Sequence, residues 1–135
     1  LALAIGILKP ARGRIEAPIG RDPRNRRRMA VVEGGRPAVT EYHVLEYVGA
    51  YTLAQVTLIT GRTHQIRVHM SAIGHPLLGD PLYGGTSPLI GRQFLHASKL
   101  GFHLPLTGEY REFASPLPQD LQDVLEGLRG GNDGG

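Results

Sequence analysis

The order of apolar and polar residues divides the first part of the chain into short strands. Residues 1–7 are almost entirely apolar, which is typical of a strand covered on both faces. Runs rich in Val, Leu, Thr and Tyr predict three further strands, at residues 29–32, 39–48 and 51–59. Glycines at 34–35 favour a tight turn after the first of these, and residues 49–50 favour a two-residue turn after the second. We therefore expect an antiparallel meander.

The segment between Lys9 and Arg28 has a different pattern. Prolines and glycines interrupt it repeatedly, and charged residues are spread along it, so no helical period survives. We expect an extended arm with one short strand near Ile15.

A helical pattern begins after residue 63. Thr63 is a good N-cap for a helix over residues 64–73, and Gly74 is suited to the left-handed position that ends a helix. The spacing of the apolar residues predicts a buried face made of Ile66, Met70 and Ile73.

The last third of the chain mixes loops, strands and a helix. Residues 75–91 are rich in turn formers and predict an irregular loop that holds a short apolar strand at 76–78. Strands are expected at 95–102 and 110–114, and Pro118 begins an amphipathic helix. Its apolar stripe consists of Leu121, Val124, Leu125 and Leu128. The fold class is thus α+β, a mixed, mostly antiparallel sheet with flanking helices, formed by one domain over residues 1–129 with a disordered glycine-rich tail at 130–135.

Composition narrows the function classes. The chain has 135 residues, enough for one domain, and no cysteine, which excludes disulfides, thiolate metal sites and a cysteine nucleophile. The absence of cysteine is typical of a reducing compartment, and we expect the cytoplasm. No apolar run approaches the roughly 20 residues that span a bilayer, so a soluble protein is expected.

Basic residues are concentrated in the N-terminal arm. Nine basic and three acidic residues lie between Lys9 and Arg36, although the formal net charge of the whole chain is only +3. Arginine pairs with phosphate oxygens and stacks on bases, so this arm favours RNA as a partner, with a solvated loop as the alternative. The predicted phosphate contacts are Arg21, Arg24, Arg26, Arg27 and Arg28.

Residues 58–85 carry the candidate chemistry, because a strand there runs through Gly-Arg-Thr directly into a helix start, a place that suits anions. A phosphate-binding Walker loop is excluded because Val56 occupies the position of its first glycine. The five-residue spacing of His64 and His69 argues against a metal site, and no nucleophile elbow supports a hydrolytic triad. A polar cluster at the helix start remains, and each member could equally have a structural role. Its members are Arg62, His64, Gln65 and Arg67.

The run TGRTHQIRVHMSAIGHPLLGDPLYGG closely resembles the C-terminal motif of RNA pseudouridine synthases of the RluA/RluD type. The segment from Ile15 to Glu46 and the later RQFLHASKLGFHLPLTGE and FASPLPQDL segments are similar to the same family, so the resemblance covers residues 1 to about 129. It implies a sheet with an RNA-binding cleft and a reaction without cofactor or metal, in which a uridine flipped out of its RNA is converted to pseudouridine. Ribosomal RNA is the first expectation for the substrate and transfer RNA the second.

The resemblance also assigns one catalytic role. The family uses an aspartate that promotes cleavage of the glycosidic bond, an arginine that pairs with it and a tyrosine that stacks on the base. Arg67 matches the arginine, and a carboxylate in a dry pocket needs such a fixed cation to stay ionised.

The family's aspartate motif, H-R-L-D-x-x-[ST]-S-G, is absent from these 135 residues, and its tyrosine strand is expected just before Leu1. Asp22 and Asp80 are poor substitutes, because Asp22 lies in the arginine-rich arm and Asp80 lies in the turn-forming GDPLYG. We therefore interpret the chain as the C-terminal part of a synthase domain, inactive alone and with an exposed sheet edge at residues 1–7. The alternative is a noncatalytic RNA-binding module derived from the same fold.

Overall fold

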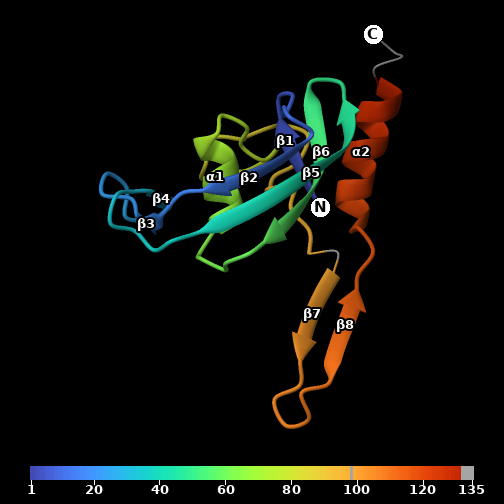
Figure 1. Cartoon of the computed structure of the whole chain (residues 1–135). Helices are drawn as coiled ribbons and strands as arrows, with labels where there is room; N and C mark the ends of the chain where they lie inside the picture. Colours follow the sequence, from blue (N-terminus) through green and yellow to red (C-terminus); the bar gives the residue numbers. More distant parts are fainter. Residues whose placement is uncertain (98, 132–135) are drawn as a thin grey trace.

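The centre of the molecule is a four-stranded antiparallel sheet. The computed structural model describes residues 1–97 and 99–131. The strand order is β1-β6-β5-β2, and the strands are β1 (Ala2–Ile5), β6 (Tyr51–Leu58), β5 (Val39–Val48) and β2 (Arg12–Glu16). With two helices against this sheet and two separate hairpins, the predicted α+β class is confirmed (Figure 1).

The hairpin between β5 and β6 is confirmed as predicted. Val48 pairs with Tyr51, and Gly49 takes a positive φ of 58° in the two-residue turn. A glycine is suited to this position because it has no Cβ to collide with the preceding backbone.

The meander prediction is wrong at its first strand. β4 (Met29–Val31) pairs with β3 (Ile19–Arg21) in a hairpin of its own and not with β5. The reason is local, since the Asp22 backbone N–H donates to the Arg28 carbonyl and its carboxylate accepts from the Arg24 N–H, which closes the loop between the two strands. The arginine-rich segment is therefore the tip of a β-hairpin.

The outer edge of β1 is covered, contrary to expectation. The Leu3 N–H donates to the Phe94 carbonyl, and the Leu3 carbonyl accepts from the Leu78 N–H. Ile5 donates to the carbonyl of Pro76 in the same way. The loop segments 76–78 and 94–96 thus act as short strands that satisfy this edge, and for this reason β7 (Lys99–His103) starts later than predicted.

The alternation of side chains along β1 builds two cores on opposite faces of the sheet. Ala2 and Ala4 face α1 (Gln65–Ala72) and pack with Met70. Leu3 faces the other way and packs with Phe94 and with α2 (Gln119–Gly131). Burial on both faces explains why the strand is almost entirely apolar.

The predicted apolar face of α1 is confirmed at Met70, with Ile66 partly buried against the same core, and polar residues are buried beside it. The buried side chains of the helix are Gln65, Val68, His69 and Met70, whereas Ile73 is exposed. Thr63 is not the cap; His64 holds that position with a left-handed φ of 54° and no side-chain capping bond. Gly74 ends the helix in the left-handed region as predicted, and the His75 N–H donates to the Met70 carbonyl.

The C-terminal elements follow the predicted order. β7 and β8 (Tyr110–Ala114) form a hairpin that extends away from the rest of the molecule (Figure 1). In α2 the predicted stripe is confirmed, because Leu121 and Leu125 are buried. The helix continues through Gly131, two residues into the predicted tail, and residues 132–135 lie outside the described part. Neither helix is long and apolar enough to cross a membrane, within the residues described.

Two glycine substitutions in the loop between α1 and β7 test how tightly this fold is packed. Gly79 has a φ of 83°, and a Cβ there would collide with the carbonyl oxygen of Arg92. Gly84, with a φ of 100°, faces open space and is the matched control. Both alanine variants lose about 1–2 kcal/mol through the positive φ, and Gly79→Ala loses about 1–3 kcal/mol more through overpacking. Equal urea midpoints for the two variants would contradict this packing.

Candidate functional site

A buried ion pair joins α1 to the loop that follows it. The Arg67 Nε and Nη2 groups donate to the two carboxylate oxygens of Asp80, each at 2.9 Å. Asp80 is 0% exposed, and the Arg67 side chain retains only 12% of its exposure. This pairing was not expected from the sequence, where Arg67 was assigned to an aspartate outside the chain.

Hydrogen bonds hold both carboxylate oxygens of Asp80 in place. Besides Arg67, the backbone N–H groups of Leu82 and Tyr83 donate to its Oδ1 atom, which is the turn role expected for this residue. Burial alone would raise the pKa of Asp80, but the hydrogen bonds from Arg67 and from these N–H groups outweigh burial and lower the pKa. Asp80 is therefore a fixed anion rather than a nucleophile.

Asp22 is excluded from a nucleophilic role on similar grounds. Its Oδ2 accepts from the Arg28 Nε at 2.8 Å, and its Oδ1 accepts from the Arg24 N–H. Both of its oxygens serve the hairpin loop, so neither aspartate that the sequence offered as a substitute is available.

One edge of the Arg67 guanidinium does not take part in the pairing with Asp80. Its Nη1 atom has no hydrogen-bond partner among the described residues. The hydrogen bonds to Asp80 raise the pKa of Arg67, which stays charged. Its guanidinium carbon also lies 5.0 Å from the centroid of the Tyr83 ring, so the side chain is held by a salt bridge and by an aromatic face.

Tyr83 connects this pair to two other segments. Its hydroxyl oxygen accepts from the Met29 N–H at 2.9 Å and lies 2.9 Å from the His64 Nδ1. The two rings meet edge to face, with centroids 5.7 Å apart. Tyr83 is thus the contact between the basic hairpin, the start of α1 and the ion pair. From the sequence, Asp80 was assigned only a turn role and Tyr83 no role, although GDPLYG, which contains both, lies within the motif of the resemblance.

Gln65 is buried and links neighbouring segments of the chain through hydrogen bonds. Its Nε2 donates to the Val39 carbonyl and to the Thr40 hydroxyl, while its Oε1 accepts from the Thr60 hydroxyl and the Arg62 N–H. All four of its hydrogen-bonding positions are used inside the protein. Gln65 therefore fixes the loop before α1, and its sequence-based assignment to RNA contact does not fit this geometry.

The residues at the start of α1 border a cavity of about 390 Å³. Arg62 lies at its rim and donates from Nε to the Pro37 carbonyl. Burial and the neighbouring Arg67 lower the pKa of His64, against an opposing effect of Asp80, so the imidazole is neutral at pH 7. The lining consists of Leu58, Arg62, His64, Gln65, Ile66, Arg67, Gln93 and Leu95. The cavity combines cations, neutral donors and apolar walls.

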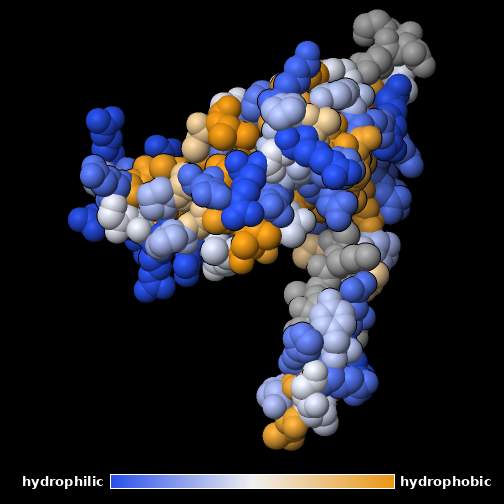
Figure 2. All heavy atoms as spheres, in the orientation of Figure 1, coloured by the Kyte–Doolittle hydropathy of each residue, from blue (hydrophilic) through white to orange (hydrophobic). Residues whose placement is uncertain are grey.

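The basic hairpin presents most of its arginines to solvent. Arg21, Arg24, Arg26 and Arg27 are exposed, and none has a carboxylate partner among the described residues. Arg28 differs, because it pairs with Asp22 and donates from Nη1 to the Leu82 carbonyl at 3.2 Å. Figure 2 shows hydrophilic side chains gathered at this end of the molecule, on the left.

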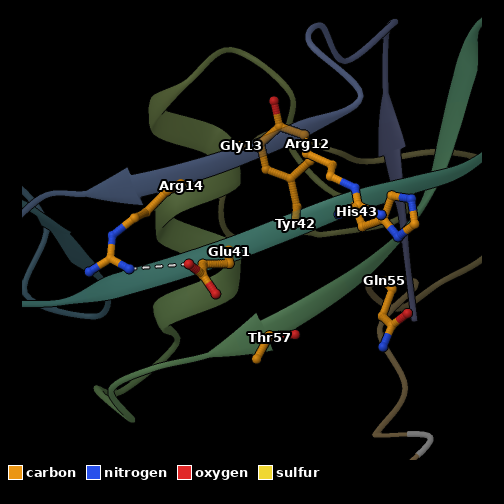
Figure 3. Close-up of a pocket in the computed structure, with 8 residues that line it drawn as sticks. All are labelled: Arg12, Gly13, Arg14, Glu41, Tyr42, His43, Gln55 and Thr57. Atoms are coloured by element: carbon orange, nitrogen blue, oxygen red, sulfur yellow. Dashed lines mark hydrogen bonds and ion pairs between the residues drawn. The ribbon is translucent and has the colours of Figure 1, made fainter.

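A second hollow lies over β2, β5 and β6 (Figure 3). It measures about 540 Å³ and is crossed by two rows of paired residues, Arg12 with His43 and Arg14 with Glu41. Arg14 is bound by the carboxylates of Glu16 and Glu41, so its charge is already neutralised. Because Glu41 also lines it, this hollow is less suited to an anion than the cavity beside Arg67, whose lining contains no acidic residue within the described part of the chain.

Comparison with known proteins decides the family. The sequence model of RNA pseudouridylate synthases matches residues 3–72. The chain belongs to the RNA pseudouridylate synthase family. It is 55% identical over 130 residues to a protein of Chloroflexus aurantiacus named an uncharacterized RNA pseudouridine synthase, and 49% identical over 138 residues to ribosomal large subunit pseudouridine synthase D of Nitrosomonas europaea. These alignments cover 95% and 96% of this chain but only 41% and 40% of the relatives.

A solved structure supports the same fold. The human RNA pseudouridylate synthase domain containing 1 protein superposes with a TM-score of 0.74 at 32% identity, over 96% of this chain and 64% of that one. The predicted family and partial pseudouridine synthase fold are therefore confirmed. The chain spans about two fifths of the length of the curated relatives named above.

The ion pair predicts how stability responds to a substitution and to acid. Asp80→Asn leaves Arg67 buried without its partner, and the free energy of unfolding at pH 7 falls by about 3–5 kcal/mol. Because the folded-state pKa of Asp80 is lowered, the parent also loses stability as the pH falls below about 4, where the unfolded chain takes up the proton first.

Urea titrations between pH 7 and pH 3 measure both effects, and Asp80→Asn shows the shallower acid dependence. Asp120→Asn is the control, since Asp120 pairs with Arg92 through the same two nitrogens on the exposed surface, where solvent weakens an ion pair and its loss costs little stability. Equal losses at pH 7 in the two variants would contradict the role given to burial.

Proposed function

We propose that the protein converts uridine to pseudouridine in RNA, and that this chain supplies the arginine of the active site and part of the RNA-binding surface. The observation that carries the proposal is the buried Arg67, locked by Asp80 with one edge of its guanidinium free beside a cavity. Membership of the family and the name of the Nitrosomonas relative support ribosomal RNA as the substrate, with transfer RNA as the second choice.

Arg67 acts in this proposal as the partner of a catalytic aspartate. The aspartate motif of the family is not in these 135 residues, and both candidate aspartates of the chain are fully engaged. We infer that the nucleophile comes from the part of the relatives that this chain does not cover. In the reaction, its carboxylate promotes cleavage of the bond between N1 of uracil and C1′ of the ribose, and C5 of the turned base then forms the new bond to C1′. C5 loses its proton and N1 gains one, so the product is an isomer of the substrate. A fixed guanidinium keeps that carboxylate ionised as the cavity dries.

A neighbouring apolar cavity offers a packing site for the segment that carries the catalytic aspartate. It measures about 570 Å³ and shares Leu58, Ile66 and Leu95 with the cavity beside Arg67. Leu58 is half-exposed although it belongs to β6. If that segment packs here, it buries apolar surface, and the side chains of the segment come within reach of Arg67.

RNA reaches the site along the basic hairpin in this proposal. Arg24, Arg26 and Arg27 carry charges that no carboxylate of the described residues neutralises. Arg28 has an internal role, which changes the interpretation made from sequence, where all five arginines contacted phosphates. Gln65 is likewise assigned to support, while Arg62 and His64 remain proposed RNA contacts at the cavity.

The proposal predicts which protein forms pseudouridine. The 135-residue chain alone forms none, whereas a version extended upstream through the H-R-L-D region converts a uridine-containing RNA. In the extended version Arg67→Ala lowers the single-turnover rate about a hundredfold or more and leaves RNA affinity nearly intact. Lysine rescues poorly because it lacks the planar fork.

Arg92→Ala is the matched control, because Arg92 makes the same two bonds to Asp120 at the surface. Its rate stays within threefold of the parent. Conversion by the chain alone, or an Arg67→Ala rate equal to that of Arg92→Ala, would overturn the proposal. RNA binding by an extended version that never forms pseudouridine would support the noncatalytic alternative.

The hairpin predicts the salt dependence of RNA binding. Changing Arg24, Arg26 and Arg27 to alanine flattens the slope of log affinity against log salt by about two to three, at roughly 0.7–0.9 per lost phosphate contact. The charge-matched control changes Arg92, Arg111 and Arg129, which all pair with carboxylates. Identical slopes for the two triple variants would show that the hairpin does not contact phosphates.

A further inference from the structure

We propose that Tyr83 is a positioning residue that holds His64 as the tautomer with its proton on Nε2, so that His64 donates to the O4 carbonyl of uracil and rejects the amino group of cytosine. This inference rests on the proposed function for the identity of the base. It concerns the choice of base rather than the isomerisation step.

The assignment of the proton follows from the partners of the Tyr83 hydroxyl. The Met29 N–H only donates, so the Tyr83 oxygen accepts there at 2.9 Å. The remaining close contact of the hydroxyl is the His64 Nδ1, also at 2.9 Å. If Nδ1 carried the proton, the hydroxyl hydrogen of a buried tyrosine would have no acceptor among the described residues, which is costly. The hydroxyl therefore donates to Nδ1, and the ring proton is on Nε2.

The same arrangement directs a donor at the cavity. His64 is part of the lining beside Arg67, and its Nε2 has no hydrogen-bond partner among the described residues. A neutral imidazole then offers a single N–H group there. The ring is neutral because burial and Arg67 both disfavour its charged form.

The backbone of His64 is strained in a way that serves this placement. Its φ of 54° is in the left-handed region, which costs a residue with a side chain roughly 1–2 kcal/mol. The structure maintains it through the bond from the Val68 N–H to the His64 carbonyl at 2.9 Å and through the Tyr83 contact. Strain of this kind in a cavity wall is typical of functional positions.

The chemistry of the two pyrimidines gives the selectivity. Uracil presents a carbonyl oxygen at position 4, which accepts a hydrogen bond, whereas cytosine presents an amino group, which donates. A fixed N–H donor on His64 therefore stabilises bound uracil. With cytosine, the same N–H group would face the amino group at position 4, and two donors cannot form a hydrogen bond. A ring free to exchange its tautomer would expose an acceptor to cytosine and lose this discrimination.

The test has two parts, and both use Tyr83→Phe, which keeps the ring over Arg67 and removes only the hydroxyl. In the ¹⁵N spectrum of the histidine rings at neutral pH, the parent shows the His64 proton on Nε2, and the variant shows a mixture of tautomers. The His64 signals are assigned by their loss in His64→Gln. A parent spectrum with the proton on Nδ1 would overturn the inference.

The second part measures the affinity of the upstream-extended protein for an RNA with uridine or cytidine at the target position. The parent prefers uridine by roughly tenfold, the worth of one discriminating hydrogen bond, and Tyr83→Phe reduces the preference to less than about twofold. Tyr42→Phe is the control and retains it, since the buried Tyr42 donates its hydroxyl to the Pro10 carbonyl at a different place. An unchanged preference in Tyr83→Phe would contradict the inference. A uridine preference in a protein that forms no pseudouridine would instead reject the proposed function alone.

Discussion

The buried pair of Arg67 and Asp80 is the interaction on which the site depends. A carboxylate without solvent exposure is costly unless its oxygens are hydrogen-bonded, and here two N–H groups of the Arg67 guanidinium and two backbone N–H groups achieve this. The loop must therefore take the shape that delivers Asp80. Close packing at Gly79 and Gly85 against the carbonyls of Arg92 and Leu77 shows how little freedom that shape has. The arginine is consequently fixed before any substrate arrives.

The pair also connects parts of the chain that are distant in sequence. Arg28 of the basic hairpin donates to the carbonyl of Leu82, and Met29 donates to Tyr83, two and three residues after Asp80. The hairpin that we assign to RNA binding thus rests on the same loop that orients Arg67. A shared support of this kind keeps the phosphate contacts and the cavity in one fixed relation, which catalysis by positioning requires.

Much of this fold could be predicted from the sequence, because the residues that determine these elements lie close together along the chain. The β5–β6 hairpin, the end of α1 at Gly74 and the stripe of α2 each depend on residues within a few positions of one another. The pairing of β4 with β3 was not readable, because it is decided by backbone bonds of Asp22 that no periodicity reports. The predicted apolar face of α1 was right at Met70 and wrong at Ile73. It did not include Gln65 and His69, which are buried because each bonds to Thr40 and to further groups inside the protein. Arg67 was found from the motif, but its partner was not, since a turn-forming aspartate gives no sign of what reaches it across 13 residues.

The central claim is that the reacting base lies in the cavity beside Arg67. The most direct measurement is photocrosslinking of the upstream-extended protein to an RNA that carries 4-thiouridine at the target position, followed by mass spectrometry of the linked peptides. The account predicts links to the residues around this cavity, in the segments 58–67 and 93–95. Links confined to the hollow over β2, β5 and β6, at Arg12, His43 and Gln55, would contradict this placement of the base.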